Sequence, residues 1–132
     1  MPITALYAGL LTPLFIFLAI RVIRERRGAR VSVGHGDNAR LLRKMRVHAN
    51  FAEYVPLALL LMGLAESVKS DARLLHVAGI ILIVGRVVHA IGLSRQPESI
   101  PLRAIGMYAT FTVLSLGALM CLVYAISTIV GM

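Results

Sequence analysis

Two long stretches of the chain contain no charged residue, and they constrain the fold more than any other feature. Residues 3–20 form one uncharged apolar run, and residues 104–132 form a second run of 29 residues. An apolar run of about 18 or more residues predicts a transmembrane helix, because about 20 residues at ~1.5 Å rise per residue cross the hydrocarbon layer. We therefore expect an integral membrane protein.

The middle of the chain adds two apolar segments, each interrupted by a single charge. Residues 47–65 contain only Glu53, and residues 74–94 contain only Arg86. Charged residues make up 15% of the chain, against about 25% in typical soluble domains. We predict an all-α fold over residues 1–132, a single transmembrane domain built as an antiparallel, up-down four-helix bundle. The predicted spans cover residues 3–23, 40–67, 72–94 and 101–130.

Positive charge is concentrated in the first loop and in the helix ends beside it. Nine of the 14 lysines and arginines lie between Arg21 and Arg46. Such clusters occur in proteins that bind nucleic acid, but in a membrane chain the positive-inside rule accounts for them. We therefore expect no nucleic acid partner. The first and third loops should face the cytoplasm, and the second loop and both termini should lie on the opposite side.

Polar residues recur at helical spacing where the second span begins. Arg43, Arg46, Asn50, Glu53 and Leu57 follow one another in steps of three and four residues, which places them in one row along a helix. A charge near the bilayer centre costs about 2.5–3.5 kcal/mol on insertion scales. Charged residues at this depth therefore face a bundle interior or a wet cavity, and they form pairs.

The pattern alone leaves two interpretations of these polar residues. One is a buried ion pair between Glu53 and Arg86 that only stabilises the bundle. The other is a binding site for a ligand with two carboxylates and an ammonium group, since arginine binds carboxylates bidentately and Asn50 both donates and accepts. On the third span, Arg86 and His89 share one side of the helix. His48 and His89 lie on different helices without a third ligand, so we predict no metal site.

Four segments of the chain together resemble the MAPEG superfamily, the membrane-associated proteins in eicosanoid and glutathione metabolism. The pattern R-x-x-x-N-x-x-E-Y-x-P over residues 46–56 is similar to the signature of that family's second helix. The segments RRGARVS (26–32), GRVVH (85–89) and IPLRA (100–104) resemble further family segments in the same order. The resemblance extends to microsomal glutathione transferases, to the microsomal prostaglandin E synthase and to compact bacterial members of the family.

This resemblance implies a homotrimer in a bacterial inner membrane, with a glutathione site between neighbouring subunits near the cytoplasmic face. The residues it implies for holding glutathione are Arg26, Arg46, His48, Asn50, Glu53, Tyr54, Arg86 and His89. It also implies a catalytic role for Arg103 beside the glutathione sulfur, with Arg27 as the second candidate. Leu93 stands where the family resemblance leads us to expect a tyrosine.

We therefore expect a glutathione transferase, or a peroxidase, that acts on lipophilic electrophiles taken from the bilayer. Glutathione, as co-substrate, supplies the thiol, and a guanidinium beside the sulfur favours the reactive thiolate form. Two alternatives remain. One is a glutathione-binding membrane protein without catalytic activity, and the other is a small four-span transporter that uses Glu53 as a proton-coupled cation site.

Overall fold

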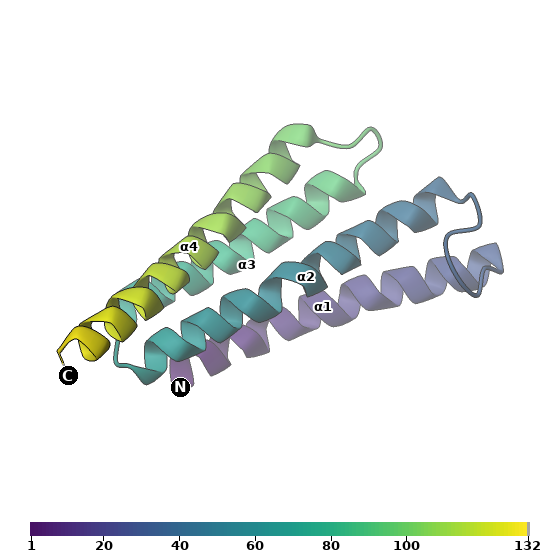
Figure 1. The fold of residues 1–132 in the computed structure, drawn as a ribbon. Coiled ribbons are helices and arrows are strands. Elements are labelled where there is room, and N and C mark those ends of the chain that lie inside the picture. The colour runs from purple at the N-terminus through teal and green to yellow at the C-terminus, as the bar shows by residue number, and fades with distance from the viewer. Residues whose placement is uncertain (132) are drawn as a thin grey trace.

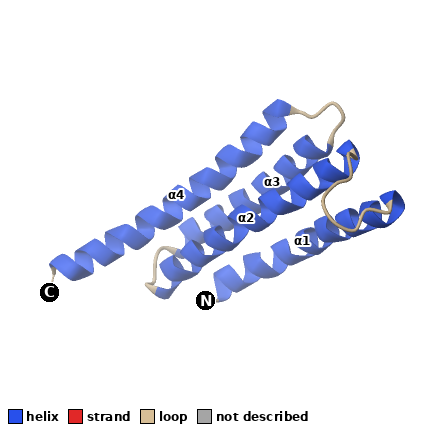
Figure 2. Ribbon diagram, turned by 45° about the vertical axis from the view of Figure 1, so that its right-hand side comes forward, coloured by secondary structure: helices blue, strands red, loops and turns tan. Residues whose placement is uncertain are grey.

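The computed structural model describes residues 1–131 and contains four long helices joined by short connections (Figure 1). The helices are α1 (Pro2–Ala29), α2 (Ala39–Ser67), α3 (Ala72–Ser94) and α4 (Ile100–Val130). Both chain ends and the α2–α3 connection lie at one end of the bundle, and the other two connections lie at the opposite end (Figure 1). Figure 2 shows only helices and loops over the described residues. The predicted all-α, up-down bundle is confirmed, and all four helices are long and apolar enough to cross a membrane.

Short polar side chains begin two of the helices. The Asn38 side chain accepts a hydrogen bond from the backbone N–H of Leu41 at 2.9 Å, which caps α2. Asp71 caps α3 by accepting from the backbone N–H of Arg73 at 2.7 Å. This hydrogen bond holds the pKa of the exposed Asp71 carboxyl below its usual range. The limits of α2, α3 and α4 lie within one residue of the predicted spans.

α1 continues beyond the predicted first span, through residues 24–29. Its last turns consist mainly of arginine and glutamate, which are good helix formers whether or not they lie in the membrane. The helix ends at Arg30, which adopts the left-handed conformation with φ 54°. The backbone N–H of Val31 then bonds to the carbonyl oxygen of Arg26 at 3.1 Å, as in a Schellman cap. Arg24, Arg26 and Arg27 therefore lie on the helix and not in the first loop.

Glycines allow α3 and α4 to approach each other closely. A Cβ atom added at Gly85 would lie 2.7 Å from the Cβ of Ala109, and one added at Gly106 would lie 2.5 Å from the Cβ of His89. Neither position has room for a side chain, so the two backbones pack directly against each other. This contact places His89 of α3 against the backbone of α4, beside the candidate site.

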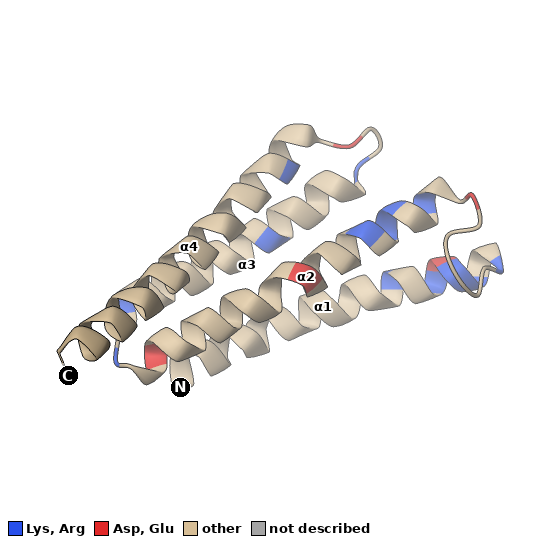
Figure 3. Cartoon of the chain, viewed as in Figure 1, with Lys and Arg blue, Asp and Glu red and all other residues tan. Residues whose placement is uncertain are grey.

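The described part of the bundle has an apolar core and an apolar outer surface. Tyr7, Leu11, Phe51, Leu82 and Val113 are among its buried side chains. Large apolar side chains also cover the outside of the helices, as expected of a surface that contacts lipid. Lysine and arginine gather at the end that holds the α1–α2 connection (Figure 3). The positive-inside rule assigns this end to the cytoplasm.

Candidate functional site

Arg86 lies inside the bundle and joins three helices. From α3, its guanidinium donates to Oδ1 of Asn50 on α2 at 2.6 Å and to Oγ1 of Thr110 on α4 at 3.1 Å. The residue is 1% exposed, and its guanidinium carbon lies 6.0 Å from the centre of the Phe51 ring. Within residues 1–131, the ion pair of Glu53 is with another arginine and not with Arg86. The buried Glu53–Arg86 bridge that the sequence allowed is therefore not formed.

The bond from Arg86 also sets the orientation of the Asn50 amide. Because a guanidinium only donates, the atom facing it must be the amide oxygen, which assigns the NH₂ group of Asn50 to the other direction. Asn50 is half-buried and lies between Arg46 and Glu53 along α2. A buried arginine thus holds a hydrogen-bond donor in place on the polar row.

Arg46 and Glu53 lie two turns apart on the outer surface of α2. Nη1 of Arg46 is 3.9 Å from Oε1 of Glu53, and their side chains are 58% and 50% exposed. This distance is longer than a hydrogen bond of about 2.7–3.2 Å, so the two charges attract each other without a direct bond. Both groups remain accessible to a ligand or to another protein. The aromatic ring of Tyr54, beside Glu53, packs edge-on against Phe111 of α4 with 5.7 Å between ring centres.

A second polar cluster lies where the α3–α4 connection meets α2. Oε2 of Glu98 accepts a hydrogen bond from Nη1 of Arg103 at 2.8 Å and lies 3.7 Å from Nη1 of Arg43. Nδ1 of His89 is 3.2 Å from the main-chain oxygen of Arg103. Since a carbonyl oxygen only accepts, this bond requires the proton on Nδ1. The Arg103 side chain is 39% exposed, so it is held by a carboxylate and still accessible.

Sequence reasoning missed Glu98. It is the acidic residue in a short connection that otherwise carries positive charge, and it lies five positions before the candidate catalytic Arg103. An acid so placed at the positively charged end of a bundle has arginines as its nearest available partners. An acidic residue between Arg95 and Arg103 was therefore the signal in the sequence from which Glu98 could have been found.

Three residues of the predicted site lie away from these clusters. Arg26 donates to the carbonyl oxygen of Gly34 at 2.8 Å and so organises the α1–α2 connection. Arg27 is exposed near the end of α1. The ring of His48 packs against Phe15 of α1 with 4.8 Å between centres. At about 100° per residue, this position is roughly 140° around α2 from Glu53.

Comparison with known proteins agrees with the pattern read from the sequence. The sequence model of the MAPEG family matches residues 4–123, which include parts of all four helices. The chain is 34% identical over 122 residues to the inner membrane protein YecN of Escherichia coli strain K12, with 92% of each chain covered. The YecN protein of Escherichia coli O6:H1 matches with the same values. Together with the four spans, these similarities identify an integral inner-membrane protein.

Proposed function

The chain belongs to the MAPEG family, and from this premise we propose that it is a membrane-embedded, glutathione-dependent transferase or peroxidase for lipophilic electrophiles. The observation that carries the proposal is the exposed Arg46–Glu53 pair, with the oriented Asn50 amide between its members. A lipid environment does not favour such a surface. A polar ligand that replaces the loose contact with shorter, charge-assisted bonds would account for the exposed charges.

The chemistry of these groups fits a small molecule with two carboxylates and one ammonium group, as in glutathione. Arg46 would bind a carboxylate, Glu53 would accept from the ammonium group, and the NH₂ of Asn50 would donate to a peptide carbonyl. Tyr54 lies beside Glu53 and would cover the bound molecule. Arg86 is buried, so it would act as a positioning residue through Asn50 rather than by direct contact.

His89 is the other buried residue in this proposal, at 2% exposed. It would position Arg103 through the hydrogen bond to the main-chain oxygen of that residue. Arg86 and His89, which the family resemblance implied as glutathione contacts, would therefore support the site from behind the residues that touch the ligand.

Arg103 is the residue we propose for favouring the thiolate. A guanidinium beside the sulfur stabilises negative charge in a site of low dielectric constant. The thiol proton would pass to solvent, and the sulfur would form a bond to the electrophilic carbon as the leaving group departs with its electron pair. Glu98 already accepts from one nitrogen of Arg103. The remaining donors of this guanidinium would face the sulfur.

We also propose that a neighbouring subunit covers the polar row in a homotrimer. In one subunit Arg46 and Glu53 are at least half exposed, at a depth where exposed charge is costly. Arg26, Arg27 and His48, which lie away from the row in their own subunit, would reach the site from the neighbour.

The transporter alternative receives less support from this geometry. A proton-coupled cation site needs a carboxylate with little competing positive charge around it, whereas Nη1 of Arg46 lies 3.9 Å from Oε1 of Glu53.

Equilibrium dialysis of glutathione with the detergent-purified protein tests the proposal. Arg46→Ala and Glu53→Gln should each weaken binding about tenfold or more, because each removes a charge-assisted bond. Arg73→Ala is the matched control, since its side chain is 92% exposed at the other end of the bundle. Absence of saturable binding by the folded wild type would overturn the proposal, and binding without turnover on a panel of electrophiles would leave only the binding function.

A further inference from the structure

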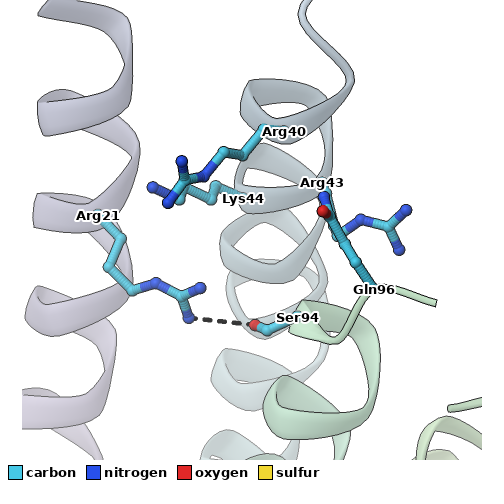
Figure 4. Close-up of a pocket in the computed structure, with 6 residues that line it drawn as sticks. All are labelled: Arg21, Arg40, Arg43, Lys44, Ser94 and Gln96. Carbon is cyan, nitrogen blue, oxygen red and sulfur yellow. Dashed lines mark hydrogen bonds between the residues drawn. The ribbon is translucent and has the colours of Figure 1, made fainter. Parts of the chain in front are cut away.

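A pocket lined by four cationic side chains lies between α1, α2 and the end of α3 (Figure 4). Its volume is about 250 Å³. The residues that line it are Arg21, Arg40, Arg43, Lys44, Ser94 and Gln96. None of them belongs to the residues proposed above to hold glutathione, and the pocket is formed within one subunit.

Carboxylates neutralise only part of the charge of this pocket. Glu25 forms an ion pair with Lys44 and lies 3.6 Å from Nε of Arg40. Glu98 lies 3.7 Å from Nη1 of Arg43, but it also binds the arginine of α4. The four cations of the pocket are therefore balanced only by the carboxylate of Glu25 and by part of the charge of Glu98. The pocket suits an anion with several acceptor oxygens, since guanidinium groups bind such oxygens in pairs.

Of the four cations that line the pocket, Arg21 is the one that no acidic side chain of residues 1–131 pairs with. Its guanidinium instead donates to Oγ of Ser94 at 3.1 Å (Figure 4) and lies 5.7 Å from the centre of the Phe17 ring. Arg21 is half-buried, so its charge is partly removed from water without a carboxylate to balance it.

An apolar groove between α1 and α3 meets the pocket at Arg21 and Ser94, which line both. The groove has a volume of about 380 Å³. The apolar side chains that line it are Leu14, Phe17, Leu18, Val87, Ala90 and Ile91. A site that is cationic at one end and apolar along the helices matches a molecule with an anionic head and a hydrocarbon tail, rather than a soluble anion.

The position of Arg21 along α1 also agrees with a ligand that has an anionic head and a hydrocarbon tail. Arg21 directly follows the uncharged residues 3–20, so it lies where α1 leaves the hydrocarbon layer. Phospholipid phosphates lie at the same level, at the end that the positive-inside rule assigns to the cytoplasm. Basic pockets between transmembrane helices on this side are suited to anionic lipid head groups.

We propose that each subunit binds one anionic phospholipid, with its phosphate in the basic pocket of Arg21, Arg40 and Lys44 and an acyl chain in the α1–α3 groove. This site is independent of the glutathione site, and either proposal can fail without the other.

Native mass spectrometry of the detergent-purified protein tests the lipid site. Phosphatidylglycerol and phosphatidylcholine with the same acyl chains are added in turn to the wild type, Arg21→Gln and Arg40→Gln. Arg24→Gln is the matched control, because Arg24 is an exposed arginine of α1 outside the pocket. The wild type should retain phosphatidylglycerol in preference to phosphatidylcholine. Each pocket variant should lower its occupancy about fivefold relative to the control.

Three outcomes would overturn the proposal. If the pocket variants and Arg24→Gln lost phosphatidylglycerol occupancy equally, the lipid would be held by general attraction to the positively charged surface and not by the pocket. Equal retention of phosphatidylcholine would mean that the pocket does not select anions. Displacement of phosphatidylglycerol by an equal concentration of glycerol 3-phosphate would mean a soluble phosphate site in place of a lipid site. Should Arg21→Gln fail to fold, Arg40→Gln decides the test alone, since its side chain is 71% exposed.

Discussion

At the scale of single residues, hydrogen bonds rather than an opposite charge surround the buried Arg86. Its acceptors are Asn50 on α2 and Thr110 on α4. Leaving a buried cation without its acceptors costs far more than an ordinary hydrogen bond contributes. The network therefore links the stability of the bundle to the orientation of the proposed binding residue, Asn50.

Two threonines of α4 allow the contribution of the Arg86 hydrogen bonds to stability to be measured. Thr110 and Thr112 both donate to the carbonyl oxygen four residues earlier, at 2.8 Å and 2.9 Å, but only Thr110 also accepts from Arg86. We expect Thr110→Val to lower the free energy of unfolding by about 1–3 kcal/mol, because Arg86 loses an acceptor. Thr112→Val should change it by less than about 0.5 kcal/mol. Chemical unfolding in one detergent checks both, and equal effects would refute the role.

We predict that the carboxylate of Glu98 weakens the effect of Arg103 on the glutathione thiol, because it partly neutralises the charge of the guanidinium. Glu98→Gln keeps the shape of the side chain but removes the charge that Arg103 now faces at 2.8 Å. We expect a larger thiolate fraction of bound glutathione at neutral pH, and Arg103→Ala should reduce that fraction. Ultraviolet absorbance of the thiolate across a pH series measures both. If Arg103→Ala left the thiolate fraction and the turnover unchanged, Arg103 would not be the activating group.

The row of polar residues could be derived from the sequence because it depends only on helical periodicity. Arg46, Asn50 and Glu53 share a side of α2 in any straight helix. The partner of Arg86 could not be derived, since it depends on how α2 is rotated against α3. Glu98 lies in a connection, where no periodicity relates a residue to its neighbours in space.

At the scale of helices, the contact between α3 and α4 determines where His89 and Arg103 meet. Gly106 lies against the Cβ of His89 and against the main-chain oxygen of Gly85, at 2.5 Å and 2.6 Å from an added Cβ. Any side chain at this position must therefore separate the helices and draw His89 away from the carbonyl of Arg103.

Gly106→Ala should lower the thermal stability, with a free-energy loss of about 1–3 kcal/mol from overpacking. The control is Gly28→Ala, since Gly28 lies within α1 and an added Cβ there meets no atom within 4 Å. That variant should be neutral or more stable by up to about 1 kcal/mol, because alanine favours helix over glycine. Thermal unfolding in the same micelles compares them. Similar behaviour of the two variants would contradict the close packing of α3 and α4.

The limits of the helices could be predicted well where apolar character or a capping residue marks them. For α3 and α4 the capping Asp71 and Pro101 lie within three residues of the apolar run, whereas for α2 the capping Asn38 marks the start nine residues before the run of residues 47–65. In α1 the hydrophobic run ends first, and the helix continues to Ala29. Hydropathy reports where the chain leaves the membrane, and it carries no information on where hydrogen bonding stops.

At the scale of the whole molecule, the exposed Arg46–Glu53 pair predicts an assembly. We expect three subunits of 14.3 kDa each in the native mass of the detergent-solubilised protein. The physical reason is that a neighbour would remove from lipid two side chains that are 58% and 50% exposed in one subunit. A monomeric mass in several mild detergents would contradict this expectation. Carbodiimide modification of Glu53 gives a second readout, since it should be slower in the assembly than after dissociation.

The extension of α1 has a consequence for which changes in chain length the protein tolerates. The 28 residues of α1 span about 42 Å at ~1.5 Å per residue, against a hydrocarbon layer of about 30 Å. An inserted residue within 21–25 would turn Arg26 and Arg27 by about 100° and shift them by ~1.5 Å. The same insertion within 31–37 would be absorbed by the connection. Natural insertions and deletions should therefore be confined to the connection and be excluded from the last turns of α1.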